Sequence, residues 1–384
     1  MAVPLFSLTP DLIVSRLCLG TMTFGEQNSL PQSFQLLDRA FHSGINFFDS
    51  AEMYLCFQYF YIRTFTVPLL FNCLVLSCPR YPVPQRAETH GRSEEYLGRW
   101  IRTRKIPRHQ VVLATKVSGP SGQMTWIRDG PASLDSWNIT EAIDGSLTRL
   151  RSDYIDLYQI HWPDRYVPMF GEIEYDPTRS FSSVSIEEQL TALQKAIDAG
   201  KIRYVGLSNE TPYGLMKFLH VAERISIRVR IVSLQNCYNL LCRNFDSGLA
   251  ECCSHERVCL LAYSPLAMGI LSGKYLSLDG GPAEARLNLF RGRYAEGESR
   301  YSLSHSTVKK ATDLYVNIAK KYGIRPVSLA IAFVLRHPLV ASVVFGATKI
   351  WQLQEALDGC KVDLIPEIVT EINRVHSAFP NPCP

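Results

Sequence analysis

Eight short apolar runs recur along this chain, and stretches with the 3.6-residue period of a helix lie between them. Each run is almost continuously hydrophobic, which is typical of parallel strands that are buried on both faces. We therefore expect strands at residues 17–19, 46–49, 111–116, 155–160, 202–207, 231–235, 258–262 and 340–345. Eight strand–helix units in succession predict an α/β fold, a single (β/α)8 TIM barrel that spans residues 1–384.

A doubly wound parallel sheet is the alternative, and it would carry a glycine-rich phosphate loop early in the chain. Residues 20–25 read GTMTFG and residues 269–274 read GILSGK, so neither segment has the spacing of such a loop. Helix starts can also be read from the sequence. We expect Asn138 to cap a helix at residues 140–150, with Glu141 three residues later.

Charge and cysteine content exclude several classes of protein. The 384 residues carry 40 Lys and Arg against 36 Asp and Glu, a net charge of +4 without a basic run, so we expect no nucleic-acid partner. The 11 cysteines form no CxxC pair and no Cys/His grouping, so we expect neither a disulfide framework nor a metal site. No signal peptide is predicted from the first twelve residues, and we expect a cytoplasmic protein.

Residues 55–81 interrupt the regular alternation of strands and helices, and they lie between the second predicted strand and the second predicted helix. This segment of 27 residues has 18 hydrophobic side chains and no acid. Its length fits a membrane span, but Arg63, Pro68 and Asn72 interrupt it, and both of its flanks belong to one barrel unit. We therefore expect no membrane partner and interpret the segment as a long hydrophobic insertion in the loop after the second barrel strand. Translated intron sequence is an alternative origin.

Polar residues follow several of the predicted strands. Asp49, Lys116, His161, Ser208 and Gln235 each stand at or just after the carboxyl end of one. The active sites of (β/α)8 barrels are built at that end. Any one of these residues alone is more often a solvated loop residue, but their joint placement predicts a catalytic or binding site.

Three segments at these strand ends carry candidate chemistry: FFDSAEMY at 47–54, ATKVS at 114–118 and LYQIHWPD at 157–164. Together they resemble the catalytic signature of the aldo-keto reductase superfamily. The likeness is strongest to its Tas-type branch, which is similar also to the β-subunits of voltage-gated potassium channels. The resemblance covers nearly the whole chain except residues 55–81. It implies an NADPH-dependent oxidoreductase that reduces aldehydes or ketones to alcohols by hydride transfer.

In this resemblance Asp49, Tyr54, Lys116 and His161 are the catalytic residues. Hydride transfer to a carbonyl leaves an alkoxide, so a proton donor must stand beside the oxygen. Tyr54 is the expected acid, although an unperturbed tyrosine, with a pKa of about 10, holds its proton near neutrality. A Lys116 ammonium beside it would favour the phenolate, and Asp49 would hold the lysine. His161 would orient the substrate carbonyl or share in proton transfer.

The same resemblance implies NADP(H) as the cofactor. The residues expected to bind it are Thr21, Met22, Ser208, Asn209, Gln235, Tyr263, Ser264, Leu266, Gly269, Lys274, Gly346, Thr348, Lys349, Gln352 and Glu355. Of these, Ser208, Asn209 and Gln235 would meet the nicotinamide carboxamide, and Tyr263 would stack on its ring. Lys349 at a helix start would suit the 2′-phosphate. The family usually has Asn at the position of Ala356. This chain therefore departs from the family pattern at one of the residues that contact adenine.

The leading hypothesis is a carbonyl reductase whose partner is a small-molecule substrate, as a monomer or a homo-oligomer. A nucleotide-sensing regulatory subunit of another protein is the alternative from a different class. A third hypothesis is an isoform that the insertion at residues 55–81 impairs. Substrate choice would depend on two variable loops, residues 162–184 and 277–304.

Overall fold

The computed structural model describes residues 2–54, 90–120, 124, 126–130, 133–169, 171–179, 183–292 and 295–383. The insertion predicted at residues 55–81 lies outside these ranges and stays a prediction. The described ranges contain all eight predicted barrel strands and the helices that surround them.

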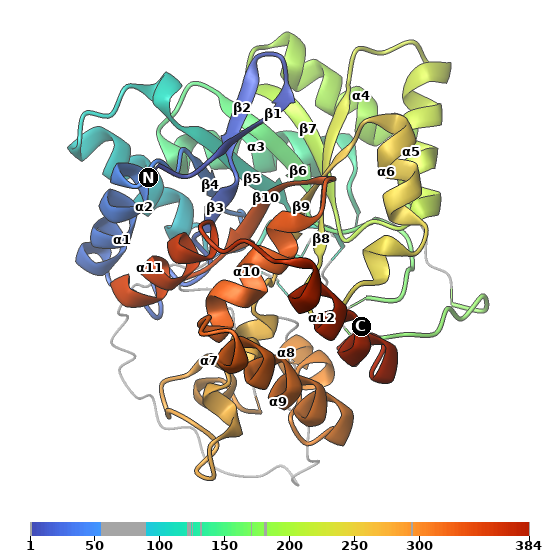
Figure 1. The fold of residues 1–384 in the computed structure, drawn as a ribbon. Coiled ribbons are helices and arrows are strands. Elements are labelled where there is room, and N and C mark those ends of the chain that lie inside the picture. Colours follow the sequence, from blue (N-terminus) through green and yellow to red (C-terminus); the bar gives the residue numbers. More distant parts are fainter. Residues whose placement is uncertain are drawn as a thin grey trace, which may run out of the picture.

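Eight parallel strands close into one barrel (Figure 1). Each strand pairs with the next along the chain, and β10 closes the ring by pairing with both β9 and β3. The strands are β3 (Leu17–Gly20), β4 (Phe47–Asp49), β5 (Val112–Val117), β6 (Ile155–Ile160), β7 (Ile202–Ser208), β8 (Ile231–Cys237), β9 (Cys259–Tyr263) and β10 (Val340–Phe345). All eight lie where the apolar runs predicted them, which confirms the (β/α)8 barrel.

Helices surround the barrel, and a few more gather beyond one end of it (Figure 1). They are α1 (Leu30–His42), α2 (Arg92–Thr103), α3 (Ser136–Leu150), α4 (Ile186–Asp198), α5 (Pro212–Arg224), α6 (Leu249–Glu256), α7 (Arg286–Leu289), α8 (Ala295–Arg300), α9 (Ser306–Lys321), α10 (Pro326–Arg336), α11 (Ile350–Gly359) and α12 (Pro366–Ala378). Short 3-10 turns are η2 (Arg108–Gln110), η3 (Asn244–Asp246), η4 (Ala267–Ser272) and η5 (Lys274–Leu276). Among the described residues, no helix combines the length and the apolar character that crossing a bilayer requires.

The start of α3 corrects one prediction. Asn138 does not cap this helix but lies within its first turn, because the helix already begins at Ser136. The cap is Asp135, whose Oδ1 accepts a hydrogen bond from the Asn138 N–H at 2.8 Å. Asp and Asn are about equally good caps, so the residue types alone did not distinguish the two positions.

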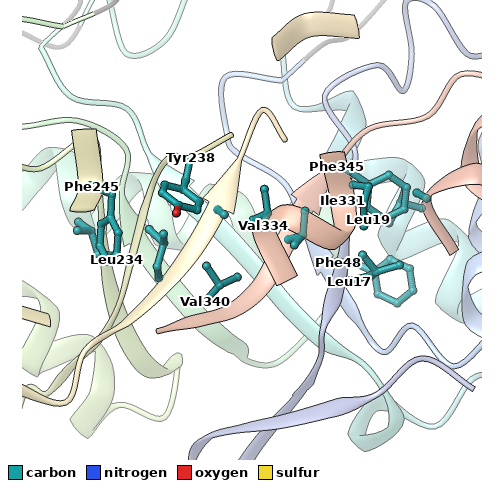
Figure 2. Close-up of a cluster of buried hydrophobic side chains, with 14 of the residues drawn as sticks. Leu17, Leu19, Phe48, Leu234, Tyr238, Phe245, Ile331, Val334, Val340 and Phe345 are labelled. Atoms are coloured by element: carbon teal, nitrogen blue, oxygen red, sulfur yellow. The ribbon is translucent and has the colours of Figure 1, made fainter. Parts of the chain in front are cut away.

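Two layers of apolar side chains hold the barrel together. The outer layer joins the strands to the helices, and Figure 2 shows part of it, with Ile331 and Val334 of α10 among side chains from β3, β4, β8 and β10. The inner layer fills the barrel and includes Phe47 and Leu157. Alternate residues of a strand point to opposite faces, so Asp49, two residues after Phe47, also points into the barrel.

An antiparallel hairpin that the sequence analysis did not identify precedes the barrel. It consists of β1 (Leu5–Thr9) and β2 (Leu12–Ser15). The side chain of Leu12 in this hairpin packs into the inner layer of the barrel. Asp11, at the turn of the hairpin, forms an ion pair with Arg203 near the amino end of β7, with 3.2 Å between the carboxylate oxygen and the guanidinium nitrogen. The hairpin therefore closes the end of the barrel opposite the strand carboxyl ends. A Pro-Asp pair between two alternating apolar runs was the signal for it.

The start of α2 is tied to the barrel by polar contacts on both sides. The hydroxyl groups of Ser93 and Ser50 share a hydrogen bond at 2.8 Å. Glu94, fully buried, pairs with Arg149 of α3 at 2.5 Å. One turn later Gly98 lets α2 approach α3 closely, since a Cβ there would lie 2.1 Å from a backbone oxygen of α3. These contacts fix both the position and the rotation of α2.

Candidate active site

A cavity of about 1200 Å³ opens at the carboxyl ends of the barrel strands. Asp49, Tyr54 and His161 line it, and the fully buried Lys116 lies against Asp49. These side chains come from β4, from β5 and from the residues that follow β4 and β6. The structure thus brings the four predicted catalytic residues together.

Lys116 and Asp49 form an ion pair inside the barrel, with 2.5 Å between Nζ and Oδ2. Lys116 also donates to the Ser50 carbonyl at 2.8 Å. The other carboxylate oxygen of Asp49 accepts from the side-chain amides of Gln159 and Gln235, at 3.1 and 3.0 Å. Hydrogen bonds of this kind offset the cost of removing two charges from water.

Tyr54 and His161 lie next to this pair. The ring centroid of Tyr54 lies 5.3 Å from Lys116 Nζ and 5.9 Å from the His161 ring, which it meets edge to face. Burial, and then the charge of Lys116, lower the pKa of His161 well below its usual range. Its Nδ1 is buried and has no hydrogen-bond partner among the described residues. At neutral pH His161 is therefore an uncharged imidazole that can donate one hydrogen bond.

A second buried ion pair, which the sequence analysis missed, holds the segment that carries Tyr54. Glu52, two residues before Tyr54, pairs with Arg128 through two hydrogen bonds of 2.5 and 3.0 Å. The two partners are 76 residues apart, so no local pattern could indicate them. Gln159 was also missed, although its place two residues before His161 was a usable signal, because alternate side chains share a strand face.

Asn209 contacts the other three residues predicted to meet the nicotinamide, which are Ser208, Gln235 and Tyr263. Its φ of 53° is left-handed, a conformation that Asn adopts more readily than most residues. Its amide donates to the His161 carbonyl at 2.9 Å, and its Oδ1 accepts from the Tyr263 hydroxyl at 2.7 Å. The backbone of Asn209 and the hydroxyl of Ser208 both donate to the Gln235 carbonyl, at 3.2 and 2.8 Å. These side chains form one connected wall of the cavity.

The chain turns sharply after β9. Ser264, Met268 and Gly269 have φ values of 53°, 55° and 95°. A Cβ on Gly269 would lie 2.9 Å from Lys274 Nζ, so glycine is what lets this ammonium approach the backbone. Burial lowers the pKa of Lys274, and the charge of Arg286 lowers it further. An anion bound here would relieve this excess of positive charge.

The start of α11 forms another part of the cavity wall. Lys349 is exposed there, and no carboxylate pairs with it within the described ranges. Gln352 Oε1 accepts from the backbone N–H groups of Thr348 and Lys349, at 2.8 and 3.2 Å. Arg325, which also lines the cavity, is paired with Asp358. Of these two cations, only Lys349 is therefore available to an anion.

All of the predicted cofactor-binding residues line the cavity except Thr21. Thr21 is fully buried, and its hydroxyl donates to the backbone carbonyl of Asp49 at 3.0 Å. Its neighbour Met22 does reach the cavity wall. Thr21 therefore supports the end of β4, and its role as a direct cofactor contact stays a prediction.

Both loops that we expect to control substrate choice contribute to the cavity. Trp162, Tyr166 and Met169 come from the loop between β6 and α4, and Ser299 comes from the long segment between β9 and α9. Trp162 belongs to a small apolar cluster that also holds Met53. This part of the wall presents apolar and sulfur-containing surface beside Tyr54.

Asp164, in the first of these loops, gives a prediction about stability and pH. Its buried carboxylate accepts from the Val184 N–H at 2.7 Å, and burial raises its pKa to about 6. In the unfolded chain the Asp164 carboxyl loses its proton near pH 4, whereas in the folded protein it keeps this proton until about pH 6. The free energy of unfolding therefore falls as the pH rises between these values. Replacing Asp164 with Asn should leave the free energy of unfolding nearly unchanged below pH 4 and raise it by about 1–3 kcal/mol at pH 7.

Denaturant titrations between pH 4 and pH 8 measure this difference. The matched control is Asp363→Asn, which removes an exposed carboxylate and should give no pH-dependent gain. A constant difference between Asp164→Asn and the wild type across this range would contradict the prediction.

Comparison with known proteins agrees with this geometry. The model of the Aldo/keto reductase family matches residues 16–377. The chain is 43% identical over 376 residues to Protein tas of Escherichia coli strain K12, covering 97% of both chains. It is 41% identical over 286 residues to an aldo-keto reductase of Babesia bovis, covering 71% of this chain and 98% of that protein. It is also 31% identical over 375 residues to a probable voltage-gated potassium channel subunit beta of Oryza sativa subsp. japonica, covering 96% and 95%. The closed barrel, the strand-end residues that converge on one cavity, and these matches together show that the chain belongs to the aldo/keto reductase family of oxidoreductases.

Proposed function

We propose that this chain is an NADPH-dependent oxidoreductase that reduces small aldehydes or ketones to alcohols, with Tyr54 as the general acid. The observation that carries the proposal is the convergence of Tyr54, His161 and the buried Lys116–Asp49 pair on one cavity. Membership of the family supports the oxidoreductase class. The proposal treats residues 1–384 as one cytoplasmic barrel domain with an insertion at residues 55–81.

The residues of the cavity fit a nicotinamide dinucleotide. Asn209, Gln235 and Tyr263 offer the neutral amide and hydroxyl groups that suit a carboxamide and its ring. Lys274 and Lys349 have no ion-pair partner in the described part of the chain, and the turn at Gly269 lets the backbone approach a phosphate. When bound, the cofactor supplies the hydride.

Side chains of this protein would carry out proton transfer and orient the substrate. Tyr54 would give its proton to the carbonyl oxygen as negative charge develops there, and Lys116 would stabilise the phenolate that remains. Because His161 is uncharged, we favour its role in orienting the carbonyl over a role in proton transfer. The Glu52–Arg128 pair would hold the Tyr54 segment in place, since a shift of about 1 Å can cost 10²-fold in rate.

An assay of NADPH oxidation with a panel of aliphatic and aromatic aldehydes and ketones tests this function. We expect consumption that requires the carbonyl compound and yields the matching alcohol, identified by mass spectrometry. Tight NADPH binding without turnover of any carbonyl in the panel would favour the second candidate, a nucleotide-sensing regulatory subunit. The 31% identity to a probable potassium channel subunit beta supports that candidate, and co-purification with a membrane channel would test it. The hypothesis that residues 55–81 impair the enzyme falls outside the described residues.

Lys349 gives a prediction about the choice of nucleotide. If it meets the 2′-phosphate, Lys349→Glu should raise the Kd for NADPH by about 10- to 100-fold and change the Kd for NADH much less, because only NADPH carries that phosphate. Fluorescence titration with both nucleotides measures this. Lys217→Glu, the same charge reversal at an exposed position on α5, is the matched control. Equal losses for the two nucleotides would count against the assignment.

A further inference from the structure

Trp351, on the first turn of α11, is an exposed aromatic residue in the wall of the cavity. It is 61% exposed, and it makes no ring contact or hydrogen bond with the part of the chain that the structure describes. Exposure alone indicates no function, because single apolar side chains are common on protein surfaces. Trp137 on α3 is 60% exposed and does not line the cavity. What distinguishes Trp351 is therefore its place in the cavity wall.

Ion pairs between α11 and the start of α10 fix the surroundings of Trp351. Residues four apart on a helix share a face, so Glu355 lies one turn after Trp351 on the same face of α11. Arg325, the residue before α10, pairs with Glu355 at 3.8 Å and also with Asp358. Arg325, Trp351 and Glu355 all line the cavity. The indole therefore belongs to a part of the wall in which two helices are tied together.

Apolar side chains line the same part of the cavity. They are Pro326 and Val327 at the start of α10 and Ala356 of α11. None of these three side chains carries a hydrogen-bond donor or acceptor. A sugar or phosphate placed against them would lose hydrogen bonds to water without replacement, whereas the face of a flat ring would not. This part of the wall therefore suits the ring system of a ligand.

The covalent structure of NADPH indicates which ring would reach Trp351, and this step rests on the proposed function. The nicotinamide is assigned to the wall that includes Asn209 and Tyr263, so the adenine is the ring system that remains. The 2′-phosphate is attached to the same ribose as the adenine, and the adenine must therefore lie close to the group that meets this phosphate. Lys349, proposed for that role, stands two residues before Trp351 in the cavity wall.

We propose that the Trp351 indole is the surface on which the adenine ring of the nucleotide stacks. Stacking of a base on an aromatic side chain strengthens binding by about 10- to 100-fold and needs no hydrogen bond at the face of the base. The contact supplies affinity in a part of the wall where Ala356 has no polar group to offer the base. Trp351 is thus a binding residue for the adenosine half of the nucleotide and takes no part in hydride or proton transfer.

Isothermal titration calorimetry with adenosine 2′,5′-bisphosphate tests the contact, because this probe carries the adenine, its ribose and the 2′-phosphate but no nicotinamide. Trp351→Ala should raise the Kd for the probe by about tenfold or more. Trp351→Phe keeps a flat ring and should recover most of the lost affinity. Trp137→Ala, which removes an equally exposed indole outside the cavity, is the matched control and should leave the Kd unchanged. An unchanged Kd in Trp351→Ala would overturn the proposal.

Tryptophan fluorescence reports the stacking directly. The chain has 5 tryptophans, and a base stacked on one of them should quench the emission of that residue. The probe should therefore quench part of the emission of the wild type and of Trp137→Phe. Trp351→Phe saturated with the same probe should lose this quenching, a result that a merely structural role of Trp351 would not give. Full quenching in the saturated Trp351→Phe variant would overturn the proposal.

Titration of the wild type and Trp351→Ala with two further nucleotides separates this inference from the proposed function. The Kd for reduced nicotinamide mononucleotide, which has no adenine, should be the same in both proteins, and an equal loss for this ligand would overturn the inference. NADPH that binds both proteins equally well would overturn the inference and leave the proposed function intact. NADPH that binds more weakly to Trp351→Ala but supports no turnover in the wild type would contradict the proposed function and leave the stacking intact. A wild type that binds neither NADPH nor the bisphosphate would overturn both.

Discussion

Replacing Tyr54 with Phe should lower kcat by about 10²-fold or more and leave the Kd for NADPH close to that of the wild type. The change removes only the hydroxyl that would protonate the carbonyl oxygen. The ring can keep its place 5.3 Å from Lys116 Nζ and 5.9 Å from the His161 ring. Because the lost interaction is made in the transition state, kcat/KM should fall by the same factor. Steady-state kinetics and nucleotide titration measure the two quantities separately.

Removing a tyrosine hydroxyl far from the site serves as a control. Tyr213→Phe removes the hydroxyl of an exposed ring on α5 and should leave turnover unchanged. A Tyr54→Phe enzyme that reduces any substrate at the wild-type rate would show that Tyr54 is not the acid. An unchanged unfolding midpoint in the Tyr54 variant would exclude misfolding as the cause of lost turnover.

Replacing Lys116 with Met should lower the free energy of unfolding by about 3–5 kcal/mol and lower kcat on the order of 10²-fold or more. The methionine fills much of the same space, but it leaves the Asp49 carboxylate buried without a cation. The Ser50 carbonyl also loses the donor that now lies 2.8 Å away. Denaturant titration measures the loss of stability, and the NADPH assay measures the loss of rate.

Two further variants show whether burial causes the effect. Adding Asp49→Asn to Lys116→Met removes the unpaired charge and should restore most of the stability, but not turnover. Lys201→Met breaks the Lys201–Asp144 pair, which has the same 2.5 Å separation but whose side chains are 37% and 45% exposed, and should cost less than about 1 kcal/mol. Equal losses for the buried and the exposed pair would contradict this account.

The sequence was most informative where local pattern and fold agree. The barrel strands are buried on both faces, so each appears as an apolar run, and β6 and β10 were predicted with the bounds that they have. The β1–β2 hairpin was missed because it contributes only a few side chains to the inner layer of the barrel. The cap of α3 was placed three residues too late, since Asp135 and Asn138 have nearly equal preference for that position.

Some residues of the candidate active site could be predicted from the sequence, and others could not. Asp49, Lys116 and His161 could be predicted to converge, because parallel strands bring their carboxyl ends together. The Glu52–Arg128 pair could not be predicted, because it depends on how two loops pack after the barrel has closed. The Tyr263 hydroxyl also has a neighbour from a distant segment, because Arg300 donates to it. Strand order gives the positions of backbone ends, but not the partners of side chains that long loops deliver.

The anchoring of α2 bears on how a gene for such a barrel can change. Ser93, Glu94 and Gly98 fix this helix against β4 and α3, so its position does not depend on the chain that leads to it. With both endpoints fixed, the entropy cost of a connection grows only with the logarithm of its length. Adding the 27 residues of 55–81 to a connection of about ten residues costs about 1 kcal/mol on that scale. Extra residues that a shifted exon boundary adds at this point can therefore be tolerated, because the parts of the barrel on either side keep their own contacts.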